Sequence, residues 1–163
     1  MADGRTVIDS LDFARTGAVL KGRVPVAALD RLADVLVDRT GALDYELRGE
    51  LDDEEKPCID LRVRGELQLS CQRCLSSLSY RIDIDRRLML VAPGQAWPDE
   101  DLADDRMDAI EASHDLAVLP LIEDEVLLVL PIVPRHEVCQ SPVATEIEHR
   151  PSPFAMLAKL KDH

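Results

Sequence analysis

Three stretches of this chain alternate apolar and polar residues with a period of two, and this pattern constrains the fold more than any other feature. The stretches cover residues 43–51, 59–69 and 78–90. Because successive side chains of a strand point to opposite faces, each stretch predicts a strand with one buried face. The connections between them are short, which favours antiparallel neighbours, so the sequence predicts an antiparallel β meander.

Other segments have the spacing of amphipathic helices. Apolar residues recur every three or four positions over residues 25–37 and 119–130, and Pro131 ends the second of these segments. A serine cap followed by proline predicts a further short helix over residues 153–161. We therefore expect an α+β fold, with an antiparallel meander packed against two or three helices in a single domain spanning residues 1–163.

The charge of the chain is strongly negative and unevenly distributed. Its 32 acidic and 19 basic residues give a net charge of −13, which argues against broad binding to a phosphate polymer. Any contact with nucleic acid would need a local basic patch. Residues 99–125 hold most of the excess acid, and the Asp-rich composition near residues 98–115 predicts a flexible acidic loop.

No apolar stretch approaches the roughly 18 residues that a membrane-spanning helix needs. The first residues also lack the basic and apolar segments of a secretion signal. These features predict a cytoplasmic protein with no membrane partner. In that compartment, four cysteines indicate thiols or metal ligands more than a disulfide framework.

Two close pairs of metal-binding residues stand far apart in the chain. Cys71 and Cys74 form a Cys-x-x-Cys turn between two predicted strands, and His136 and Cys139 follow the second predicted helix. Three thiolates and one imidazole would complete a closed structural zinc site. Unliganded thiols and a redox pair remain as alternatives, although a redox pair is expected at the start of a helix. Cys58 has no nearby companion and is interpreted as a small core residue.

Several arginines lie in or beside the predicted strands and are candidates for contact with RNA. The candidates are Arg62, Arg64, Arg73, Arg86 and Arg87. Alternation places Arg62 and Arg64 on one face, with Arg86 or Arg87 beside them, and guanidinium groups can pair with phosphate in a forked geometry. The alternative is that these arginines pair across strands with Asp83 or Asp85.

The sequence contains no arrangement that points to catalysis. Glu123, Asp124 and Glu125 are consecutive in a predicted helix, so their side chains point about 100° apart and cannot all ligate one ion. We interpret them as acids in the early turns that interact with the helix dipole. The chain also lacks a glycine-rich phosphate loop and the common hydrolase motifs. We expect that the protein is not an enzyme.

Three blocks of sequence resemble the YceD family, whose members are known as large ribosomal RNA subunit accumulation proteins. The blocks are the turn at residues 69–75, the segment 122–134 with His136 and Cys139 behind it, and the closing segment 152–160. They occur in the order found in the family, and the resemblance extends over essentially the whole chain. The matching positions are Cys71, Arg73, Cys74, Glu123, Asp124, Glu125, Pro131, Pro134 and Phe154.

The resemblance implies a bacterial cytoplasmic factor that supports the synthesis, processing or stability of 23S ribosomal RNA. Its partner would be a 23S rRNA precursor or a large-subunit assembly intermediate, and the family supplies no catalytic residues. An alternative function is that of an acidic binding module, or chaperone, for a basic large-subunit ribosomal protein of the L32 type. The acidic stretch at residues 99–125 motivates this alternative, because it could attract and shield a basic partner.

Overall fold

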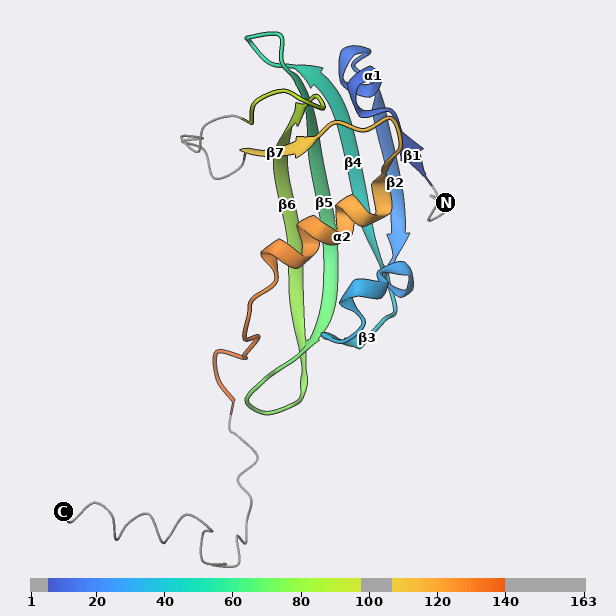
Figure 1. Ribbon diagram of the computed structural model, residues 1–163. Coiled ribbons are helices and arrows are strands. Elements are labelled where there is room, and N and C mark those ends of the chain that lie inside the picture. Colours follow the sequence, from blue (N-terminus) through green and yellow to red (C-terminus); the bar gives the residue numbers. More distant parts are fainter. Residues whose placement is uncertain (1–5, 98–106, 140–163) are drawn as a thin grey trace, which may run out of the picture.

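The computed structural model describes residues 6–97 and 107–139. Its main feature is a six-stranded sheet, in which five strands lie in the order β2-β4-β5-β6-β7 and the short strand β3 also pairs with β5 (Figure 1). The bounds are Val19–Pro25 for β2, Leu36–Asp38 for β3, Ala42–Leu51 for β4, Pro57–Ser70 for β5, Ser77–Val91 for β6 and Met107–Glu111 for β7. The predicted α+β class is confirmed.

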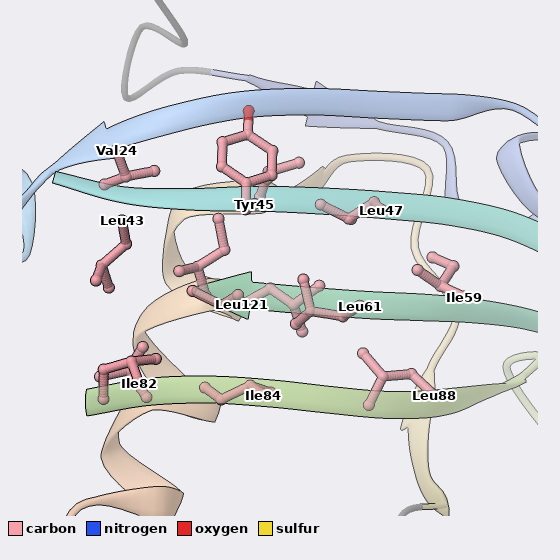
Figure 2. Packing of buried hydrophobic residues seen from close by; sticks show 14 of the residues in the cluster. Val24, Leu43, Tyr45, Leu47, Ile59, Leu61, Ile82, Ile84, Leu88 and Leu121 are labelled. Carbon is pink, nitrogen blue, oxygen red and sulfur yellow. The ribbon is translucent and has the colours of Figure 1, made fainter. Parts of the chain in front are cut away.

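The strands β4, β5 and β6 are the meander that the alternating pattern predicts. Both pairs are antiparallel, and the register places Val63 between Tyr45 and Ile84. Side chains on one face of these strands are buried and gather toward α2, the helix Val118–Val129 (Figure 2). Because each buried aliphatic side chain contributes about 1.5–3 kcal/mol, this face supplies most of the stability of the fold.

The helix α2 crosses the sheet and closes the core (Figure 1). Its buried residues Val118, Leu121, Ile122 and Val126 recur at helical spacing. The backbone becomes extended at Leu130, directly before proline, as the sequence predicts. The predicted helix over 119–130 is therefore confirmed.

The predicted helix over residues 25–37 is wrong. The segment forms two 3₁₀ turns, Val26–Ala28 and Asp30–Leu32, and then enters β3, which pairs with β5. Leu29 and Leu32 are fully buried, but a spacing of three fits a 3₁₀ turn as well as an α-helix. Pairing of the following residues with β5 prevents continuation of a helix.

The amino-terminal elements were not predicted. The helix α1 spans Ser10–Arg15, and the strand β1, Val7–Ile8, pairs with β8, Leu116–Ala117. The helix lies directly on the backbone of β4, where a Cβ added to Gly49 would come within 2.1 Å of the carbonyl oxygen of Phe13. Only glycine permits this contact, so α1 and β4 cannot approach in this way with any other residue at position 49.

The predicted acidic loop over 98–115 is wrong for residues 107–111. Residues 107–111 form β7, which pairs in parallel with β6 at the edge of the sheet, and residues 98–106 lie outside the described part of the chain. The acids Asp108 and Glu111 are exposed on β7, so their charge is compatible with an edge strand. The predicted helix over 153–161 also lies outside the described residues. Within the described ranges, every helix is too short or too polar to cross a membrane.

Candidate metal centre

The turn between β5 and β6 meets the arm that follows α2, residues 130–139, at one end of the sheet. The two segments are joined by a backbone hydrogen bond from the amide of Gln72 to the carbonyl oxygen of Pro134, 2.8 Å long. Within the turn, the amide of Leu75 donates to the carbonyl of Cys71 at 2.8 Å, and Leu75 adopts a φ of +62°. This tight turn aims the side chains of Cys71 and Cys74 toward the arm.

The structure brings together Cys71, Cys74, His136 and Cys139, the four predicted ligands. Their donor atoms all lie within 4.8 Å of one another. The Sγ atoms of Cys71 and Cys139 are 3.7 Å apart, and Cys74 Sγ is 3.4 Å from His136 Nδ1. Around a tetrahedral zinc ion, two sulfur ligands lie about 3.8 Å apart, and a sulfur and a nitrogen about 3.6 Å apart. These two distances are therefore close to those of a tetrahedral zinc site.

Neighbouring groups orient the imidazole for metal binding. Nε2 of His136 donates to the carbonyl oxygen of Ser77 at 3.1 Å, which leaves the lone pair on Nδ1, the atom that faces the cysteines. A hydrogen bond of this kind to the far nitrogen is typical of metal-binding histidines. The guanidinium of Arg73 donates to the carbonyl of His136 at 2.8 Å and holds the backbone of the arm.

The electrostatics of the turn favour thiolates. Backbone N–H groups, above all that of Cys74, lower the pKa of Cys71 to about 5, and the amide of Ser76 is the main group that lowers the pKa of Cys74. Burial instead raises the pKa of Cys139. The cysteines are free thiols, and the Cys-x-x-Cys pair precedes a strand rather than a helix. The arrangement is suited to metal binding more than to a thiol redox pair.

Cys58 lies apart from this cluster. It is fully buried, and burial raises the pKa of its thiol to about 11. A thiol with such a pKa is a poor nucleophile and a poor ligand. The interpretation of Cys58 as a core residue is confirmed.

The candidate arginines are divided between three places. Arg62, Arg64 and Arg87 share the outer face of the sheet, which we define as the face opposite α2, whereas Arg86 is on the α2 side and Arg73 is in the β5–β6 turn. On the outer face, charges of opposite sign alternate across the strands in three rows. The rows are Arg23–Asp44–Arg64–Asp83, Lys21–Glu46–Arg62–Asp85 and Arg48–Asp60–Arg87.

Ion pairs follow these rows. Arg64 lies 3.1 Å from Asp83, Arg62 lies 3.5 Å from Asp85, and Arg87 lies 2.9 Å from Asp60. The cross-strand pairing considered as an alternative for these arginines is therefore present. The outer face carries both signs in close alternation rather than a positive patch.

The acidic triplet of α2 does not cap the helix. The helix begins at Val118, so the triplet lies beyond the first turn, where the dipole has little effect. Glu123 is buried and accepts a hydrogen bond from the amide of Arg31 at 3.1 Å, and Asp124 forms an ion pair with the Arg31 side chain. Glu125 is buried 3.7 Å from Arg86, and burial raises its pKa. The triplet instead fixes α2 against β6 and the 3₁₀ turn Asp30–Leu32.

The sequence indicated the four candidate ligands, which the structure brings together, but not the groups that support them. The carbonyl of Ser77 has no sequence signal, because any residue supplies a backbone carbonyl. Arg135 stands beside His136 in the arm and is not among the arginines that the sequence indicated as candidates for contact with RNA. Its position next to a predicted ligand was the signal that could have identified it.

Comparison with known proteins places these features in a family. The sequence model of a family described as large ribosomal RNA subunit accumulation protein YceD matches residues 59–161, a span that includes all four ligand positions. The protein of Haemophilus influenzae with the same description is 26% identical over 166 residues, which cover 94% of each chain. No solved structure matches the chain.

Proposed function

The chain belongs to the YceD family of large ribosomal RNA subunit accumulation proteins, and from this premise we propose that it is a non-catalytic ribosome-biogenesis factor. It supports the synthesis, processing or stability of 23S rRNA in the cytoplasm, through a precursor or an assembly intermediate of the large subunit. The observation that carries this proposal is the family match over residues 59–161, which spans β5, β6, α2 and the candidate metal centre.

The donor set supports a structural zinc ion at Cys71, Cys74, His136 and Cys139. Four protein ligands leave no open position for water or substrate, so zinc bound there would stabilise the arm rather than activate a nucleophile. This closed geometry is consistent with a non-catalytic role. Measurement of zinc in the purified protein tests the site, with Cys74→Ser expected to lose the metal.

A test in cells addresses the function itself. Deletion of the gene is expected to lower the ratio of 23S to 16S rRNA, and the wild-type gene is expected to restore it. Affinity purification of the protein, with and without ribonuclease, is expected to recover 23S sequence or large-subunit proteins. An unchanged ratio, together with recovery of neither RNA nor ribosomal protein, would refute the proposal.

Binding of a basic ribosomal protein of the L32 type remains a second candidate. Asp108, Glu111 and Asp115 are exposed on or beside β7, next to the acids of residues 99–105 in the sequence. Glu123 and Glu125 are buried, and they therefore contribute little to a surface that attracts a partner.

Neutralisation of the acidic segment separates the two candidates. Deletion of residues 99–115 would remove β7, so the substitutions Asp101→Asn, Asp104→Asn and Asp105→Asn are a better test. If the protein is a chaperone, binding of L32-type protein should weaken, most strongly at low salt, while binding of 23S fragments should not. Unchanged protein binding would remove the motivation for this candidate.

A further inference from the structure

Nearly all cations in the described part of the chain lie beside a carboxylate. The exceptions among residues 6–97 and 107–139 are Arg15, Arg73 and Arg135. Arg15 lies in the last turn of α1, where a cation interacts favourably with the helix dipole. Arg73 and Arg135 both lie at the candidate metal centre, outside any helix. Arg73 donates to the carbonyl oxygen of His136, and neither arginine has a negatively charged side chain beside it among the described residues.

The side chain of Arg73 reaches the backbone of the arm next to Arg135. Nη2 of Arg73 donates to the carbonyl oxygen of His136, the residue directly after Arg135. This bond uses one of the five N–H donors of the guanidinium, and both arginine residues are exposed. The chain has a net charge of −13, yet these two exposed guanidinium groups have no carboxylate beside them among the described residues. They are therefore the part of the described surface best suited to bind an anion.

Large apolar side chains are exposed beside these arginines. Leu75 is 69% exposed, Ile132 is 100% exposed and Val138 is 94% exposed. Leu75 also has a left-handed backbone, which costs about 1 kcal/mol or more in a residue with a branched side chain and is the conformation that favours glycine. Neither burial of the side chain nor backbone preference explains a leucine at position 75. Contact of the Leu75 side chain with a binding partner would explain it.

We propose that Arg73, Leu75, Ile132, Arg135 and Val138, the knuckle surface, bind an unpaired loop of ribosomal RNA. The guanidinium groups pair with phosphate oxygens, and the apolar side chains contact bases that have left the helical stack. The proposal rests on the proposed function and names the contact surface for it. RNA is favoured over a protein partner because two of the three arginines that lack a carboxylate partner among the described residues are at this surface, and phosphates would supply the missing anions.

The charges of the site limit the number of phosphate contacts. A zinc ion with three thiolates and a neutral imidazole carries a net charge of −1, so no broad positive field surrounds the knuckle surface. The contact therefore depends on two guanidinium groups that reach individual phosphates. For single-stranded RNA, loss of both is expected to reduce the slope of log affinity against log salt by about 1.4.

The test measures binding of the zinc-loaded full chain to overlapping fragments of 23S rRNA by fluorescence polarisation. The double variant Arg73→Gln/Arg135→Gln is expected to bind the best fragment at least about tenfold more weakly. Arg135→Gln alone should lose several-fold, and it leaves the hydrogen bond from Arg73 to the arm in place. The matched control is Arg62→Gln/Arg64→Gln on the outer face, which removes the same charge and should change affinity by less than about twofold.

The variant Leu75→Gly distinguishes a loss of contact with RNA from a loss of folding. Glycine relieves the left-handed backbone, so the variant should unfold at the same or a higher temperature and still bind RNA several-fold more weakly. Wild-type affinity in both Arg135→Gln and Leu75→Gly would overturn the proposal, as would an equal loss in the outer-face control. Wild-type protein that binds no fragment, but binds a ribosomal protein through these residues, would make the surface a protein interface. The cellular 23S ratio tests the proposed function independently of each of these results.

Discussion

The outer face of the sheet and the knuckle surface are both exposed and both contain arginine, yet they are built in opposite ways. On the outer face, each arginine has a carboxylate on a neighbouring strand, and the same pattern repeats in three rows. At the knuckle surface, a few residues surround one cluster of four candidate ligands, and Arg73 and Arg135 have no carboxylate partner within residues 6–97 and 107–139.

The difference shows how stability and binding are divided in this molecule. Repeated weak ion pairs make the outer face tolerant, because loss of any one pair leaves the core of the sheet unchanged. The knuckle end has no such redundancy, because it contains the one group among the described residues that could hold a metal ion, and such a site needs all four of its side chains. Substitutions of similar size should therefore have very different effects in the two regions.

The largest effect is expected for a change of a ligand. Cys139→Ser should abolish zinc binding and release the arm, so that amide hydrogen exchange accelerates in residues 71–77 and 130–139. The core strands β4 and β5 should stay protected, because backbone pairing along both strands and a buried face hold them in the sheet. Cys58→Ala is the matched control, which removes a thiol and should retain the zinc. Equal zinc content in the two variants would contradict the assignment.

A change in the core should produce the next largest effect on global stability. Leu61 is fully buried on the face toward α2 (Figure 2), and Leu61→Ala should lower the free energy of unfolding by about 2–5 kcal/mol. Urea denaturation measures this loss. Leu75→Ala is the exposed counterpart and should lower stability by less than about 0.5 kcal/mol. Comparable losses in both would show that the knuckle end is part of the same cooperative core.

A smaller and pH-dependent effect is expected from Glu125, which is buried on the α2 side of the sheet. Because burial raises the pKa of this carboxyl above 4.5, the native state holds its proton more tightly than the unfolded chain does. The contribution of this group to stability should therefore fall as the pH rises from about 4.5 through the pKa of the native state. Denaturation of Glu125→Gln over this range should lack this decline.

The exposed Glu111 supplies the control for this measurement. Glu111→Gln on β7 should leave the pH dependence of the wild type unchanged. If Glu125→Gln and the wild type show the same pH dependence, Arg86 offsets the cost of burying the Glu125 carboxylate. The ion pair of Glu125 with Arg86 would then resemble those of the outer face in its small net effect on stability.

The smallest effect is expected on the outer face itself. Arg64→Gln removes one ion pair whose side chains are 68% and 49% exposed, and it should cost less than about 1 kcal/mol. High salt should reduce the difference further, because it screens exposed charges. Zinc content and the hydrogen exchange of the arm should not change. A loss as large as that of Leu61→Ala would mean that the rows act as a cooperative network.

The sequence predicted the elements whose pattern extends over many residues. The strands β4, β5 and β6 follow from long alternation, and α2 follows from helical spacing that ends before Pro131. The candidate ligand set follows from residue type and spacing, and the structure shows that its four residues lie together. The resemblance to the YceD family is confirmed by the comparisons.

Short elements and tertiary contacts were not predictable in the same way. The six residues of α1 are too few for a periodic signal, although Asp9 caps the helix by accepting from the amide of Asp12 at 3.0 Å. The segment 25–37 was misread because 3₁₀ turns bury residues at nearly helical spacing. The acids of α2 were misread because their partners, Arg31 and Arg86, are distant in sequence.

The 68 positions that separate Cys71 from Cys139 have a consequence for biosynthesis. Cys71 and Cys74 leave the ribosome long before His136 and Cys139, which follow α2 in the chain. A nascent chain that stops before residue 136 offers the thiols of Cys71 and Cys74 but not the full set of four candidate ligands. A zinc ion at this site would therefore gain its full set of four ligands only after the chain has been made as far as Cys139.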